Sequence, residues 1–269
     1  MNEIFDIKRL WKLMQYEVVN YIPNFFKSLL IFASVIAAVW IFSLTVDYSI
    51  LPNGRDSLVG VLFMFAVALS PFVIYKDMND RKKGYIYAMT PASTLEKLLS
   101  MIVLCVVVVP VLSYSVLTAT DLLLHLLTKA GMGSFSEMVL YNPFDAIVAT
   151  NVEDLNACSL PVLDGILGYL NLTAYTIMFN TIFRKNKVLK TILFNISVIF
   201  VLVILTAVVA NMTSPEFWEN LFSPLDEWLE GKTDVELFRY LMIAGRCVSV
   251  LFSALFFVIS YFRIKRVNY

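Results

Sequence analysis

The chain has 269 residues, of which 59% are apolar and 16% charged, and its net charge is zero. Soluble domains average about 45–50% apolar and 25% charged residues, so this composition excludes an ordinary soluble protein. Nucleic-acid binding is not expected either, because the 21 basic residues are dispersed along the chain instead of forming one basic surface.

Six apolar runs are each long enough to cross about 30 Å of hydrocarbon as a helix. They cover residues 25–45, 57–75, 98–124, 160–183, 188–210 and 240–262. Sixteen of the 21 Lys and Arg residues lie in the N-terminal segment, the second and fourth loops and the C-terminal tail, or within three residues of these segments. Cytoplasmic segments carry the excess of basic residues, so both termini and these two loops are predicted to be cytoplasmic. The sequence therefore predicts an all-α integral membrane protein, with a single transmembrane domain of six helices over residues 1–269.

Residues 4–22 are predicted to form an amphipathic helix that lies in the membrane surface. Apolar residues, among them Trp11 and Met14, recur every three or four positions and share one face. The rest of the helix carries the polar residues Lys8, Arg9, Lys12, Gln15 and Glu17, and this combination favours the headgroup boundary. Pro23 is expected to end the helix before the first span. The alternative is that the apolar face packs on a soluble partner.

The second loop, residues 76–97, ends in a helix start. Ser93 and Glu96 have the spacing of a capping box, in which each side chain accepts a hydrogen bond from the backbone of the other residue. The third span, which follows, contains Pro110, and the missing N–H of this residue is expected to kink the helix or open its hydrogen bonding.

One apolar cluster stands out in this loop, between its basic run and the cap. The cluster consists of Tyr85, Ile86, Tyr87 and Met89. Crossing a membrane does not require these residues, and aromatic anchors dominate many protein interfaces. We therefore interpret the cluster as a docking surface for a cytoplasmic partner, with packing against the protein's own helices as the alternative.

Ionisable residues inside the spans are candidates for a functional role. Asp121 and His125 share one helix face near the outer end of the third span, which allows a proton relay, although a solvated structural contact is the preferred reading. Asp164 is within about one turn of the outer boundary and can reach water. Arg246 lies roughly 9 Å inside the last span and is expected to snorkel outward or to pair with an acid of the outer loop. With one His and three Cys in the chain, no metal site or cofactor is expected.

The fifth loop, residues 211–239, is predicted to contain short outer helices. At Ser214 and again at Ser223, a serine precedes a proline, and acidic residues follow within the next turn. This order suits a helix N-cap followed by Pro at the first helical position. We expect two short helices within 214–230, rich in Trp and Phe, just above the outer leaflet.

Taken together, these features resemble a membrane (permease) subunit of a bacterial ABC-2 type ABC transporter. The resemblance covers the full chain: an interfacial helix, six spans with both ends inside, a basic first cytoplasmic loop and short helices between spans five and six. In addition, the stretch Met89-Thr-Pro-Ala-Ser-Thr-Leu-Glu-Lys-Leu-Leu-Ser100 is similar to a Leu-Pro-Ala-Ser-x-Leu-Glu-Lys stretch of such chains, with Thr90 in place of the more usual Leu.

The resemblance implies a location and partners. Two membrane subunits, as a homodimer or a heterodimer, would sit in the bacterial inner membrane on two cytosolic ATPase subunits, and residues 76–97 would dock into a groove on each ATPase. This chain has no Gly-x-x-x-x-Gly-Lys-Ser/Thr phosphate-binding loop, so the ATPase would be a separate polypeptide and this chain is not expected to be an enzyme.

The sequence also bears on three other classes of function. A non-enzymatic membrane scaffold or assembly factor is the main alternative, because composition does not distinguish it from a permease. A membrane-embedded protease or metalloenzyme would need a nucleophile–base pair or metal ligands that the sequence does not offer. A secondary transporter would show repeated broken spans and a polar site at the midplane, whereas only Pro110 interrupts a span centrally.

Overall fold

A computed structural model of the chain describes residues 5–46, 51–78, 84–127, 161–212, 223 and 234–266. All regular structure in this part of the chain is helical. The longer helices are α1 (Ile7–Val46), α2 (Leu51–Ile74), α8 (Pro161–Ile182), α9 (Lys187–Met212) and α11 (Asp234–Lys265). Along the chain, α2 is followed by the short helix α3 (Gly84–Met89). Three consecutive elements then form one continuous rod before α8: α4 (Thr94–Val103), the π-helical turn η2 (Leu104–Val108) and α5 (Val109–Leu127).

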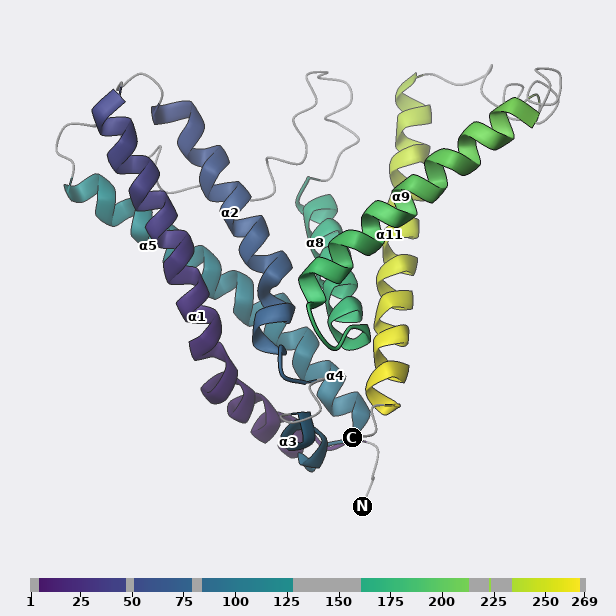
Figure 1. Ribbon diagram of the computed structural model, residues 1–269, viewed down its shortest axis with the longest axis horizontal. Coiled ribbons are helices and arrows are strands. Elements are labelled where there is room, and N and C mark those ends of the chain that lie inside the picture. The colour runs from purple at the N-terminus through teal and green to yellow at the C-terminus, as the bar shows by residue number, and fades with distance from the viewer. Residues whose placement is uncertain are drawn as a thin grey trace.

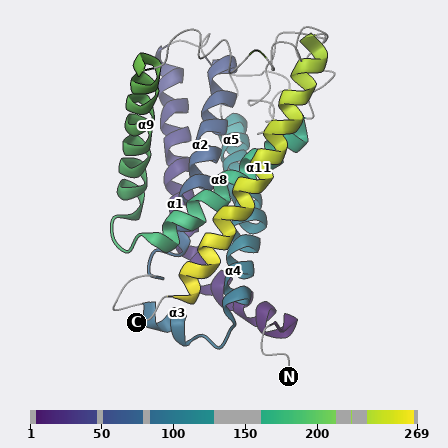
Figure 2. The same cartoon turned by 90° about the vertical axis from the view of Figure 1, so that its right-hand side faces the viewer.

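The helices form two groups that meet near α3. In Figure 1, α1, α2 and α5 lie on one side and α8, α9 and α11 on the other, and α1 and α9 diverge from each other away from α3. Contacts between α2 and α8 and between α4 and α11 join them. The start of α1, the start of α4 and the end of α11 lie near α3 in both views, and we refer to this region as the α3 end (Figures 1 and 2).

Among the described residues, four helical stretches are long and apolar enough to cross a membrane: Ile7–Val39, Thr94–Leu124, Lys187–Val209 and Glu236–Lys265. The structure is therefore compatible with a multi-pass membrane protein. Helices suit apolar runs of this kind because they satisfy every interior backbone N–H and C=O group within the segment, where lipid offers no partner.

The helix at the start of the chain differs from the prediction. The expected end at Pro23 is wrong, because Pro23 lies inside α1, which continues without a break to Val46. A proline within a helix removes one backbone donor, which can bend the helix without ending it. Pro23 is exposed, so its ring is not packed in the core. Figure 1 shows the first turns of α1 turning away from the axis of the rest.

The main apolar core lies among α1, α2 and α4. Buried side chains on α1 recur at intervals of four, as at Phe25 and Leu29, and they pack with residues of α2 such as Val67 and of α4 such as Met101. Ile177 of α8 also belongs to this core. Spacing by four residues places side chains on one face of a helix, so a single stripe of α1 supplies its contribution.

The α4–α5 rod departs from regular helix just before Pro110. In η2, the N–H of Val109 donates to the carbonyl oxygen of Leu104, five residues back. The sequence predicts that Pro110 disturbs the helical hydrogen bonding. The π-helical turn η2, just before Pro110, is a disturbance of this kind. The carbonyl oxygen of Cys105 accepts a hydrogen bond from the Tyr169 hydroxyl of α8 at 2.5 Å.

Candidate functional site

The link from α3 to α4 is closed by a capping box. Ser93 has extended backbone geometry, with φ −68° and ψ 159°, and its hydroxyl accepts from the Glu96 N–H at 3.2 Å. In return, Oε2 of Glu96 accepts from the Ser93 N–H at 2.8 Å. Two backbone donors at the start of α4 are satisfied in this way, which fixes the direction in which the chain enters the helix.

Glu96 also holds the beginning of α1. Its Oε1 accepts from the backbone N–H of Asp6 at 2.7 Å and lies 3.1 Å from Nη2 of Arg9. The carboxylate is fully buried, and its partners come from segments about 90 residues apart. The sequence predicts the cap, but it carries no signal for this second set of partners, since neither Asp6 nor Arg9 is distinguished from the other charged residues nearby.

A second buried carboxylate joins three helices a few turns further along. Oε2 of Glu17 in α1 accepts a hydrogen bond from the hydroxyl of Tyr75, the residue that follows α2, at 2.9 Å. It accepts another from the hydroxyl of Ser100 in α4 at 2.5 Å. The sequence analysis assigned Glu17 to the polar side of the first helix, and this is wrong. Glu17 is four residues from Leu13 and eight from Phe25, and it points into the bundle on the same buried stripe.

The predicted docking cluster is divided by the fold. Tyr87 is turned inward: it is 5% exposed, its ring meets Tyr75 edge-on at 6.4 Å, and its carbonyl oxygen accepts from Nζ of Lys97 at 2.9 Å. Met89, two residues later, is 78% exposed. The side chains of Tyr85 and Ile86 lie outside the described residues. Tyr87 thus anchors α3 to the bundle, and Met89 is available on its outer side.

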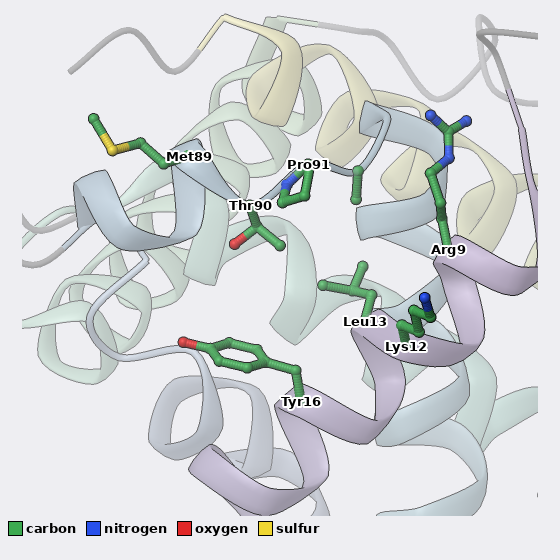
Figure 3. Close-up of a pocket in the computed structure, with 8 residues that line it drawn as sticks. Arg9, Lys12, Leu13, Tyr16, Met89, Thr90 and Pro91 are labelled. Atoms are coloured by element: carbon green, nitrogen blue, oxygen red, sulfur yellow. The ribbon is translucent and has the colours of Figure 1, made fainter.

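A cavity of about 490 Å³ lies between the first turns of α1 and the segment that follows α3. It is lined by Arg9, Lys12, Leu13, Tyr16, Met89, Thr90, Pro91 and Ala92. In Figure 3, Leu13, Tyr16, Thr90 and Pro91 surround the cavity, while Met89 points away from the α1 residues. Its size is within the range of ligand-binding pockets, about 300–1,000 Å³.

The two residues predicted to face the membrane surface, Trp11 and Met14, are both on α1, and neither of them lines this cavity. Trp11 is 59% exposed and Met14 is partly buried. Because Leu13 and Glu17 define the side of α1 that packs on the bundle, Trp11 lies on a different side from the packed stripe.

One ion pair lies on the other group of helices. Nε and Nη2 of Arg246 in α11 donate to Oδ1 and Oδ2 of Asp164 in α8, at 2.7 and 2.9 Å. The partner of Arg246 is thus an acid in the first turn of α8, where the sequence analysis expected snorkelling or an acid of the outer loop. Asp121 and His125 belong to α5, but their side chains lie outside the described residues, as do the predicted outer helices of 214–230 except residue 223.

The described part of the chain shows no cluster of three or more His, Cys, Asp or Glu side chains that could hold a metal ion. Three buried ionisable side chains, Glu17, Glu96 and Lys97, lie instead at or near the α3 end. Comparisons with protein-family models, with curated proteins and with solved structures found no match to this chain.

Proposed function

We propose that the chain is a membrane-spanning permease subunit of a bacterial ABC-2 type transporter, coupled to a separate cytosolic ATPase through residues 76–97. The observation that carries the proposal is the construction of α3. This short helix is fixed on its inner side by Tyr87 and by the capping box that follows it, and it presents Met89 outward. A rigid, partly apolar projection beyond the ends of membrane helices can transmit force from a docked subunit.

The proposal includes six spans. Besides the four candidate spans, α2 has 24 residues and α8 has 22 residues, which correspond to about 36 and 33 Å of helix. Both lengths exceed the roughly 30 Å of a hydrocarbon core. An even number of spans agrees with the start of α1 and the end of α11 lying at one end of the molecule (Figure 1).

The length of α1 supports an interfacial segment at its beginning. Its 40 residues extend about 60 Å, twice the thickness of the hydrocarbon core. Lys8, Arg9 and Lys12 all lie in its first two turns, so this end is the one that extends into the headgroups. We propose that this part of α1 lies along the inner surface of the bacterial cytoplasmic membrane, with Trp11 and Met14 towards lipid.

Orientation can be tested with single cysteines and a membrane-impermeant thiol reagent. Lys76→Cys and Lys185→Cys replace exposed lysines of the proposed cytoplasmic loops and are expected to react only after the cells are opened. Lys232→Cys, in the proposed outer loop, should react in intact cells. Labelling of Lys76→Cys from outside would overturn the orientation.

Docking can be tested at Met89, whose side chain makes little contact with the rest of the protein. Met89→Asp introduces a charge into the proposed interface and should weaken co-purification of an ATPase subunit at least ten-fold, because an unpaired carboxylate would be buried there. Asn186→Asp adds the same charge at an exposed turn and serves as the control. An ATPase that stays bound to the Met89→Asp protein would remove α3 as the docking element. If no ATPase co-purifies with the unmodified protein, the scaffold or assembly-factor function is favoured.

A further inference from the structure

The two buried glutamates are equally shielded from water, but their partners differ. Glu17 and Glu96 are both 0% exposed. The oxygens of Glu96 accept hydrogen bonds from the backbone N–H groups of Asp6 and Ser93. The guanidinium of Arg9 lies 3.1 Å from Oε1 of the same carboxylate. Donors to both oxygens and a cation in contact compensate a full negative charge, so Glu96 can be buried in its ionised form.

Glu17 has fewer partners, and they are neutral. Its Oε2 accepts hydrogen bonds from the hydroxyls of Tyr75 and Ser100. Its Oε1 is buried and has no hydrogen-bond partner among the described residues. Glu17 also forms no ion pair with any residue in the described part of the chain. An ionised Glu17 would therefore be a charge removed from water with one oxygen lacking a donor, which is strongly unfavourable.

The titratable groups around Glu17 do not supply the missing contact. Lys97, on the facing helix α4, attracts a negative charge on Glu17, but its Nζ donates to the carbonyl oxygen of Tyr87 in α3 at 2.9 Å. The phenol of Tyr75 and the thiol of Cys105 in η2 also interact electrostatically with Glu17. Phenols and thiols are uncharged at neutral pH and cannot balance an anion. A proton can neutralise the carboxylate without a further side chain.

We infer that Glu17 is a proton-binding site of the folded protein, which takes up one proton from water at neutral pH, whereas Glu96 stays ionised. The neutral carboxyl group still accepts from the hydroxyls of Tyr75 and Ser100. The contact between α1, α4 and the residue after α2 then holds without a buried charge. This inference goes beyond transport and does not require an ATPase partner.

The proton makes this contact sensitive to pH, in a direction that follows from linkage. Because the folded protein holds the proton more tightly than the unfolded chain, the stabilisation is complete at acidic pH, below the range in which an unfolded glutamate ionises. It decreases as the pH rises through the range in which the folded protein releases the proton. An ionised, compensated Glu96 has the opposite dependence, since its contacts are lost on acidification.

Infrared spectroscopy of the full-length protein in mild detergent tests the protonation directly. A protonated carboxyl group has a carbonyl stretching band that an ionised carboxylate lacks. At neutral pH, Glu17→Gln should remove one such band, and Glu96→Gln, the control at an equally buried position, should leave it unchanged. Tyr75→Phe keeps Glu17 but removes a hydroxyl that stabilises the carboxylate, so the band should persist to a higher pH than in the unmodified protein.

Unfolding temperatures give a second measurement. Between about pH 5 and about pH 9, the unmodified protein should lose about 5 °C more than the Glu17→Gln protein, which has no proton to release there. Equal losses in the two proteins, or no difference in the carboxyl band between them at neutral pH, would overturn the inference. If Glu17→Gln does not fold, the comparison with Tyr75→Phe decides, and a band that disappears at the same pH in both proteins would overturn it.

Discussion

Helix α9 and the core of α1, α2 and α4 are both strongly apolar, but the core side chains are buried and most side chains of α9 are exposed. Stretch Lys187–Val209 of α9 is the most apolar of the candidate spans, and every described side chain from 196 to 209 is exposed. The less apolar α1 packs a continuous stripe against α2 and α4. Figure 2 shows α9 standing at one side of the bundle. Residues 196–209 of α9 present an apolar surface that suits contact with lipid or with another membrane subunit.

The difference shows that hydropathy does not select which membrane helices pack together. In a bilayer, separated helices remain in an apolar medium, so their association depends on close packing and on polar contacts. The core has both kinds of contact, with Glu17 joining α1, α2 and α4. Helix α9 makes polar contacts of this kind in its first turns, where Lys187 and Thr191 are buried and the hydroxyl of Tyr175 donates to Asn195.

The largest effect is expected from removing matched phenylalanine rings in the two regions. Phe25 of the core is 1% exposed and Phe200 of α9 is 65% exposed. Phe25→Ala should lower the free energy of unfolding by about 3 kcal/mol, because the ring leaves a cavity among packed helices. Phe200→Ala should change it by less than about 0.5 kcal/mol. Unfolding of both variants in detergent measures the contrast, and similar losses would show that α9 packs as tightly as the core.

An intermediate effect is expected where the start of α9 contacts the residue that follows α2. Nζ of the buried Lys187 donates to the carbonyl oxygen of Tyr75 at 2.9 Å and to Oδ1 of Asn180 at 2.7 Å. Lys187→Met removes a donor from two acceptors and should cost about 2–3 kcal/mol of unfolding free energy. Lys190→Met, at an exposed position one turn later, is the control and should cost little. Equal unfolding temperatures for the two variants would contradict an anchoring role for Lys187.

The smallest effect is expected for the ion pair between α8 and α11. Asp164→Asn, Arg246→Gln and the double variant form a double-mutant cycle for this bidentate contact. We expect a coupling energy of about 1 kcal/mol, since polar contacts between membrane helices contribute modestly. Unfolding measurements on the four proteins give this value. A coupling near zero would mean that this ion pair does not help to hold α11 to α8.

Much of the helical layout could be predicted from the sequence. The apolar run at 188–210 corresponds to α9 at Lys187–Met212, and the run at 160–183 corresponds to α8 at Pro161–Ile182. The cap at Ser93 could also be predicted, because a capping box is formed by residues three apart. Such features are local, and their physical cause lies within a few turns of chain. Pro23 was misjudged because a proline disfavours helix without forbidding it.

The candidate site was less predictable because its contacts are long-range. Tyr87 is buried because it contacts Tyr75 and Lys97. Nothing in the sequence around Tyr75 or Lys97 indicates that either residue contacts Tyr87. Likewise, the cavity beside α3 exists only because residues 9–16 and 89–92 are brought side by side. A sequence pattern shows that a residue is apolar or charged, but it does not show what lies opposite that residue.

The sequence by itself determined that this protein is helical and rich in apolar stretches of membrane-spanning length, because lipid leaves helices as the form in which such stretches satisfy their backbone hydrogen bonds. Only the tertiary structure decided that Glu17 and Glu96 are buried as links between helices and that Arg246 pairs with Asp164. It also decided that the side chains of residues 196–209 of α9 remain exposed. These outcomes depend on which helix faces meet. That choice depends on shape and on a few polar contacts between residues far apart in the chain, and hydropathy does not encode it.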